Sequence, residues 1–181
     1  MMFCLMPVIS EGRISPQWAV RWYIMTGPAE YGVEIGQDSF PFSFKFSWGT
    51  GTVFGNYRNY VGLKATCSIY IPFPMTLTFV LKANNGIALY IDEVPVVYSM
   101  EELIKGRAYR EETAQIFVEK GWHKLKLHYY EWEGEALVSF SFKPPPAEEL
   151  FWVLADIEMR LEDLAATVQS LLEQLQKITP Q

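Results

Sequence analysis

The stretch from Thr76 to Val97, TLTFVLKANNGIALYIDEVPVV, decides the fold that this sequence predicts. Apolar residues recur at every second position from Met75 to Leu81 and again from Ile87 to Ile91, which is typical of half-buried strands. Between the two runs, Ala83-Asn84-Asn85-Gly86 supplies residues that tolerate a positive φ. We therefore predict a β-hairpin with Asn84-Asn85 at its turn.

This turn is the candidate ligand site of the chain. Asn84, Asn85 and Asp92 would place two amide groups and one carboxylate at one edge of a sheet. A binding site and a plain structural hairpin both explain these residues, and the two interpretations stay open.

The rest of the chain up to residue 143 repeats the strand pattern. Alternating runs separated by turn residues indicate about nine strands and almost no helix. Gly27 to Asp38 is rich in glycine and is expected to be a loop. The fold class predicted for residues 15–143 is an all-β antiparallel sandwich.

Five aromatic residues share one face of a single predicted strand. They alternate with Pro41, Ser43, Lys45 and Ser47, and they are Phe40, Phe42, Phe44, Phe46 and Trp48. Exposed rings of this kind would make a sugar-stacking platform, but a soluble protein seldom exposes so large an apolar patch. We expect these rings to lie in the core.

The order of motifs resembles the protective-antigen-type β-sandwich family, known from an anthrax toxin component, from fungal adhesins and from inserts in glycosidases. The motifs that carry the resemblance cover roughly residues 15–143, and they are Trp22, Phe44 to Trp48, Tyr60 to Ala65, Asn84 to Gly86, Asp92, Val118 to Leu127, Tyr129 to Glu131, Gly134 and Ala136. The resemblance implies a surface-exposed binding module, with glycans as the expected ligand.

The resemblance also bears on cofactors. Adhesins of this family hold calcium with two adjacent aspartates at the turn, where this chain has Asn84 and Asn85. Calcium favours charged oxygen ligands, so we expect no cofactor, and calcium is disfavoured here. Direct glycan binding through Tyr57, Tyr60 or Trp132 would need no metal.

Composition excludes several classes of partner. The chain has 181 residues, a formal charge of −6 and 50% hydrophobic residues. No basic field is available for nucleic acid, and the apolar runs are too short for membrane insertion. The two cysteines, Cys4 and Cys67, are expected to act as small apolar residues rather than as a disulfide.

Two segments flank the predicted sandwich. Residues 1–14 form an apolar N-terminal arm, expected to pair as an edge strand or to lie against a partner subunit. The arm lacks the basic start of a signal peptide. The family resemblance implies an extracellular surface, and the alternative location, a virion, would need no signal peptide. Residues 144–147 contain three prolines and form a stiff linker.

The C-terminal helix, residues 148–179, carries an unbroken heptad seam, which predicts a coiled coil. The seam consists of Leu150, Leu154, Ile157, Leu161, Leu164, Val168, Leu171, Leu175 and Ile178. Leucine at most a positions and mixed Leu and Ile at d favour a trimer, with a tetramer next. The alternative is a single helix that folds back onto the sandwich.

No catalytic motif is present in the sequence. His123 and His128 are five residues apart on a predicted strand and so face opposite sides, while Glu131, Glu133 and Glu135 are explained by a solvated turn. We therefore predict a non-enzymatic, oligomeric binding module for glycans, made multivalent by its stalk. The alternative is a structural virion component (fibre, spike or decoration protein) or a surface-layer component without a ligand site.

Overall fold

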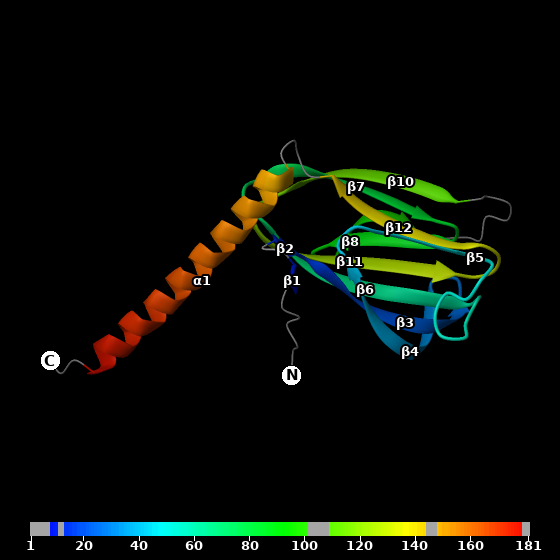
Figure 1. Ribbon diagram of the computed structural model, residues 1–181, viewed down its shortest axis with the longest axis horizontal. Coiled ribbons are helices and arrows are strands. Elements are labelled where there is room, and N and C mark those ends of the chain that lie inside the picture. The colour runs from blue at the N-terminus through cyan, green and yellow to red at the C-terminus, as the bar shows by residue number, and fades with distance from the viewer. Residues whose placement is uncertain (1–7, 11–12, 101–108, 144–147, 179–181) are drawn as a thin grey trace.

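A computed structural model describes residues 8–10, 13–100, 109–143 and 148–178 of the chain. Its main body is a sandwich of two antiparallel β-sheets, and one long helix projects from one end of that body (Figure 1). The prediction of an all-β antiparallel sandwich with a C-terminal helix is therefore confirmed at the level of these elements.

The described strands fall into three sheets. The six-stranded sheet has the order β4 (Glu30–Pro41), β3 (Gln17–Gly27), β6 (Val61–Ile71), β11 (Gly121–Glu131), β8 (Gly86–Ile91) and β9 (Val94–Ser99). The four-stranded sheet has the order β10 (Arg110–Val118), β7 (Met75–Ala83), β12 (Ala136–Lys143) and β5 (Phe44–Gly49). The two-stranded sheet pairs β1 (Val8–Ser10) with β2 (Arg13–Ser15), and the helix is α1 (Glu148–Ile178).

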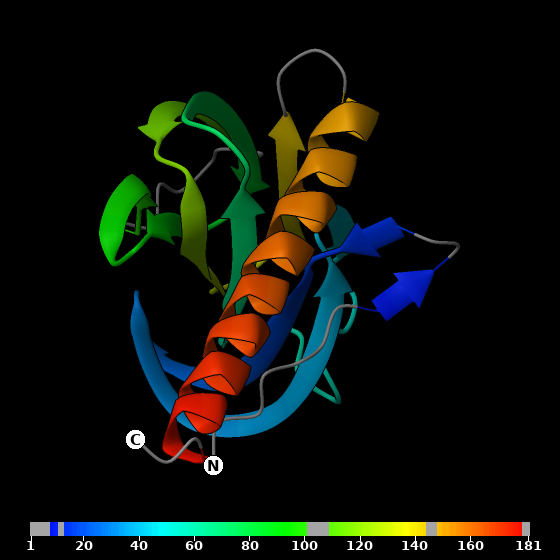
Figure 2. The ribbon, with the colours of Figure 1, turned by 90° about the vertical axis from the view of Figure 1, so that its left-hand side faces the viewer.

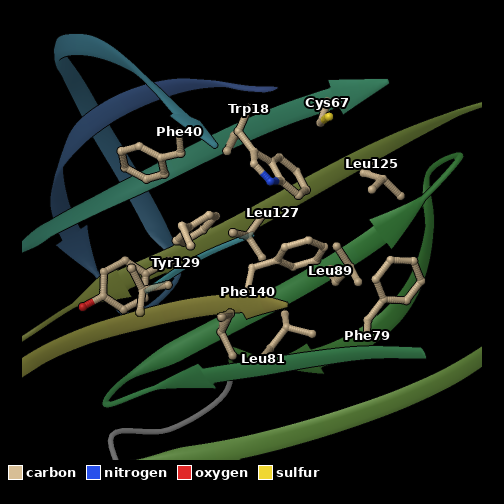
Figure 3. Close-up of a cluster of buried hydrophobic side chains, with 14 of the residues drawn as sticks. Trp18, Phe40, Cys67, Phe79, Leu81, Leu89, Leu125, Leu127, Tyr129 and Phe140 are labelled. Atoms are coloured by element: carbon tan, nitrogen blue, oxygen red, sulfur yellow. The ribbon is translucent and has the colours of Figure 1, made fainter. Parts of the chain in front are cut away.

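The core lies between the two large sheets and is built from alternate residues of their strands. Trp18 and Leu127 reach it from the six-stranded sheet and Leu81 and Phe140 from the four-stranded sheet, all fully buried (Figure 3). The rings of Trp18 and Phe140 meet edge to face with centroids 5.0 Å apart. Cys67 is buried in the same core as an unpaired thiol, as predicted.

The predicted hairpin at Asn84-Asn85 is wrong. β7 and β8 belong to different sheets, so these two residues carry the chain across the core from one layer to the other. Both strands turn alternate apolar residues toward the core, although β8 is also largely buried on its other face. Alternation alone does not distinguish a hairpin from a crossover. The actual hairpin joins β8 to β9 through Asp92 and Glu93, which have φ of 49° and 70°.

Two further expectations need correction. Residues 30–41 form strand β4 rather than a loop, and its mostly exposed residues explain why no alternation was visible. The five aromatics do not share one strand, because β4 ends at Pro41 and β5 begins at Phe44 in the other sheet. Phe40 is on β4, Phe42 lies in the bend between the strands, and the other three are on β5. The prediction that they belong to the core is confirmed, with Phe46 and Trp48 only partly buried.

The described parts of the N-terminal arm pair with each other, Val8 with Ser15 and Ile9 with Ile14, and not with an edge of either large sheet. Residues 1–7 and 11–12, and with them Cys4, lie outside the described residues, as does the linker at 144–147. β2 contacts α1, so this small sheet lies near the base of the helix (Figure 2).

Candidate functional site

The structure separates the three predicted ligand residues. Asn84 and Asn85 precede β8, whereas Asp92 follows its other end, and a strand of this length spans about 20 Å. Asp92 is engaged locally, because its Oδ1 accepts the Lys124 amide at 2.8 Å and its Oδ2 contacts the His123 Nδ1 at 2.6 Å. Asp92 therefore serves the β8–β9 turn rather than the Asn84-Asn85 bend.

The Asn84-Asn85 bend lies against a buried carboxylate, that of Glu131, where the sequence predicts a solvated turn. Glu131, the last residue of β11, has no solvent exposure, so that interpretation is wrong for this residue. Asn85 Nδ2 donates to its Oε2 at 2.8 Å, and the Tyr129 hydroxyl donates to the same oxygen at 3.2 Å. The register contained the signal, since Glu131 continues the inward-facing positions of Leu127 and Tyr129.

Burial dominates the electrostatics of this carboxyl group. It raises the pKa of Glu131 to about 7, although the hydrogen bonds from Asn85 and Tyr129 oppose the rise. The second oxygen, Oε1, has no hydrogen-bond partner among the described residues. Asn85 and Glu131 thus form a small internal polar site at the end of the sandwich.

A rim of exposed side chains surrounds this polar site. Tyr60 has a φ of 54°, and its amide donates to the Trp132 carbonyl at 3.1 Å. Its ring meets Trp132 edge to face at 4.8 Å, and its hydroxyl donates to Glu133. Tyr60 and Tyr57 remain about two-fifths exposed, at 40% and 39%. Three connecting segments meet at this end of the sandwich, which we call the loop end. They are the loop 50–60, the loop 132–135 and the Asn84-Asn85 bend.

The helix leaves from the opposite end of the sandwich (Figure 1). Its first turns are fixed by three contacts: Ala155 is buried, Lys120 Nζ lies 2.8 Å from the Glu158 carboxylate, and the Tyr70 hydroxyl donates to Glu162 at 2.5 Å. These contacts use a helix face beside the heptad seam and leave the seam exposed from Ile157 to Leu175.

Most of the predicted oligomerisation residues are exposed in this single chain. Leu154 is half-buried, and the side chains of Leu150 and Ile178 lie outside the described residues. The other six are between 46% and 60% exposed, and they are Ile157, Leu161, Leu164, Val168, Leu171 and Leu175. The structure differs from the alternative, a helix folded back along the sandwich, because residues 161–177 are all exposed and α1 projects away from the body in Figure 1.

Among the described residues, no group of three or more His, Cys, Asp or Glu side chains lies close enough to hold a metal ion. His123 and His128 face opposite sides of the six-stranded sheet, as their spacing predicted. No helix in the described part is long and apolar enough to cross a membrane.

Comparisons with known proteins give a fold. No protein-family model and no curated protein matches the sequence. An anti-sigma factor domain-containing protein matches at 18% identity and a TM-score of 0.58, over 72% of this chain and 44% of that one. A second such protein, from Clostridium clariflavum, matches at 16% identity and a TM-score of 0.54, over 71% and 42%. The chain thus spans less than half of these proteins.

One solved domain of similar size gives the fold its name. The PA14 domain of the antifreeze protein MpAFP matches at 11% identity and a TM-score of 0.52, over 72% of this chain and 83% of that one. A β-glucosidase from Kluyveromyces marxianus, solved in complex with glucose, matches at 9% identity and a TM-score of 0.51, over 73% and 16%. The sandwich has a PA14-like fold, which is the protective-antigen type that the sequence resembles.

Proposed function

We propose that this protein is a non-enzymatic, oligomeric module that binds glycans at its loop end and displays several copies of that end on a coiled-coil stalk. The observation that carries the proposal is the arrangement of the chain. Polar and aromatic side chains gather at one end of a rigid sandwich, and a helix with an uncovered apolar seam leaves the other end. Linking weak sites in this way raises their combined affinity without new contacts.

The loop end has the chemistry of a sugar site. A sugar needs a few fixed polar groups beside an apolar surface, and the exposed ring of Tyr60, the indole of Trp132 and the carboxylate of Glu133 supply both. Part of a β-glucosidase solved with glucose shares this fold, which makes glycans the first ligands to test. A glycan-binding role places the protein on an extracellular surface or on a virion.

A glycan array tests this function on the full-length chain. We expect Tyr60→Ala to lose most of the binding, because the ring and its link to Glu133 disappear together. Phe117→Ala is the matched control, since Phe117 is an exposed aromatic on β10 at the stalk end. Equal binding by both variants would place the ligand elsewhere.

A structural role without a ligand is the second candidate, because the predicted site is already satisfied internally. The Asn85 amide is bound to Glu131, and the Asp92 carboxylate is bound to His123 and Lys124. Under this alternative the protein would be a virion or surface-layer component, and the array would show no binding above background for any glycan.

A further inference from the structure

A second group of side chains lies away from the loop end, on the outer face of the six-stranded sheet. We call it the tyrosine–lysine patch, and it consists of Tyr23, Tyr31, Lys64, Tyr90 and His128. Each of the five comes from a different strand and is half-buried. Lys64 lies directly opposite His128 in the β6–β11 pairing.

The rings of the patch are in mutual contact. The His128 ring lies between Tyr31, with centroids 5.8 Å apart, and Tyr90, at 5.2 Å. Tyr23 meets Tyr31 edge to face at 5.6 Å. Three tyrosines and a histidine therefore form a continuous aromatic surface across β3, β4, β11 and β8.

The backbone is shaped to hold Tyr31 there. The Tyr31 hydroxyl donates to the Tyr129 carbonyl at 3.1 Å, which ties β4 across β3 and β6 to β11. A Cβ at Gly62 would lie 2.9 Å from Cε1 of Tyr31 and 2.5 Å from Sδ of Met25. Glycine at position 62 thus permits the close approach that brings Tyr31 onto this face.

The patch carries the positive charge of Lys64, which has no counter-ion within the described parts of the chain. Lys64 Nζ lies 4.4 Å from the centroid of the Tyr31 ring and 5.4 Å from that of Tyr23. No carboxylate among the described residues lies within ion-pair distance of it, whereas the neighbouring Lys126 is paired with Glu93. In a chain with a net charge of −6, this unpaired ammonium group on an aromatic surface is suited to an anionic ligand.

His128 adds a neutral donor to that charge. Burial, together with the nearby charges of Lys64 and Lys126, lowers the pKa of His128 to about 4, and Glu93 opposes this shift. At neutral pH the ring is therefore uncharged and retains one N–H to donate.

We propose that the tyrosine–lysine patch binds a carboxylate-bearing sugar, such as a uronic or sialic acid residue of a glycan. The carboxylate pairs with Lys64 and accepts from His128, and the apolar face of the sugar lies on Tyr31 and Tyr90. This inference rests on the proposed function, because the ligand is again a glycan. It adds a second binding site and a preference of that site for acidic sugars over neutral ones. Trp132, Tyr31 and Tyr90 pack against one buried cluster, which places the patch close to the loop end.

The test compares two probes that differ only in charge. Calorimetry on the full chain would use an oligogalacturonate and its methyl ester, and sialyllactose and its methyl ester as a second pair. We expect each acidic probe to bind about tenfold more tightly than its neutral counterpart, with the difference shrinking at high salt. Lys64→Gln should remove the difference, whereas Lys45→Gln should keep it, since exposed Lys45 lies on β5 of the other sheet.

Several results would overturn the inference. Equal binding of acid and ester by the unaltered chain would do so without any variant, and so would equal effects of Lys64→Gln and Lys45→Gln. Binding of neutral glycans alone would overturn it and leave the proposed function standing. Absence of binding to every probe and to the glycan array would remove both.

Discussion

Among the described residues, Glu131 is the one charged residue that is fully buried. Its position could have been predicted from the register of β11, but its burial could not, because a carboxylate at the end of a strand is normally solvated. What holds it inside is the Asn85 amide, which comes from a distant part of the sequence. Asn85 was thus predicted as a site residue, and its partner was missed.

This burial predicts a pH dependence of stability. The pKa of Glu131 is raised to about 7 in the folded protein from 4.5. The folded state therefore holds a proton that the unfolded state releases between these values, and the free energy of unfolding falls as pH rises from about 4.5 to about 7. We expect Glu131→Gln to remove that fall and to be about 2 to 3 kcal/mol more stable than the unaltered protein at pH 8.

Urea unfolding at several pH values would measure the difference between the two proteins, which cancels the contributions of other groups such as His128. Glu135→Gln is the matched control, because Glu135 is exposed in the turn just beyond. Parallel curves for Glu131→Gln and the unaltered protein would show that the carboxyl group does not titrate in this range.

The Asn84-Asn85 bend leads to a second prediction at this scale, that calcium does not bind there with useful affinity. By the family resemblance, Asn84 and Asn85 stand where the calcium-binding adhesins have two aspartates, and Asn85 is already bound to Glu131. The double change Asn84→Asp and Asn85→Asp adds two negative charges and is expected to create a calcium site. Micromolar calcium binding by the unaltered protein in calorimetry would contradict the first half of this prediction, and no binding by the double variant the second.

At the scale of elements, alternation predicted most strands but not their partners. The residue ranges of β7 and β8 were predicted correctly, but their pairing with each other was not. Two buried strands joined by a short polar bend have the same sequence pattern in a hairpin and in a crossover between sheets. Gly86 shows the physical difference. It has no positive φ, and it is needed because a Cβ there would lie 1.9 Å from the Tyr130 ring.

We therefore expect Gly86→Ala to destabilise the protein by about 2 to 4 kcal/mol, through overlap with Tyr130. The double variant with Tyr130→Leu should recover much of this loss, since the ring that would collide is gone. Thermal unfolding of the two single variants and the double variant measures the coupling between these positions. Additive effects would show that the backbone, rather than the ring, requires glycine.

For the helix, the testable element is the seam. Leu161 is 55% exposed in the single chain and occupies a middle a position. Leu161→Asp is expected to dissociate the oligomer, because it would bury an unpaired charge between helices. Circular dichroism should then show less helix and unchanged strand. Ser170→Asp adds the same charge on the face opposite the seam and should leave the assembly intact. Joint loss of helix and strand would mean that the helix belongs to the sandwich core.

At the scale of the whole molecule, two neighbouring faces of α1 have separate roles. One face, marked by Ala155, Glu158 and Glu162, fixes the helix to its own sandwich, and we propose that the exposed seam beside it binds other copies. The sequence predicted the seam because heptad periodicity is local. It did not predict the anchoring contacts, because Lys120 and Tyr70 are brought to the helix only by the folded sheet.

This arrangement argues for a parallel assembly of three chains. In parallel packing, all the sandwiches would lie at one end of the stalk, each attached to its own helix. No sandwich would then block the contact between the apolar seams of the helices. The contact surface of the helix is wider than a dimer needs, because leucine occupies a positions and small or apolar residues occupy e positions. The leucines are Leu154, Leu161 and Leu175, and the e residues are Ala165 and Leu172.

Sedimentation equilibrium of the full chain should therefore give three times the 20.9 kDa of one chain, with little change at high salt because the seam is apolar. A chain truncated after Phe142 should sediment as a monomer that keeps its strand content. A monomeric full chain at micromolar concentration would contradict the stalk, and an oligomeric truncated chain would move the interface to the sandwich or the N-terminal arm.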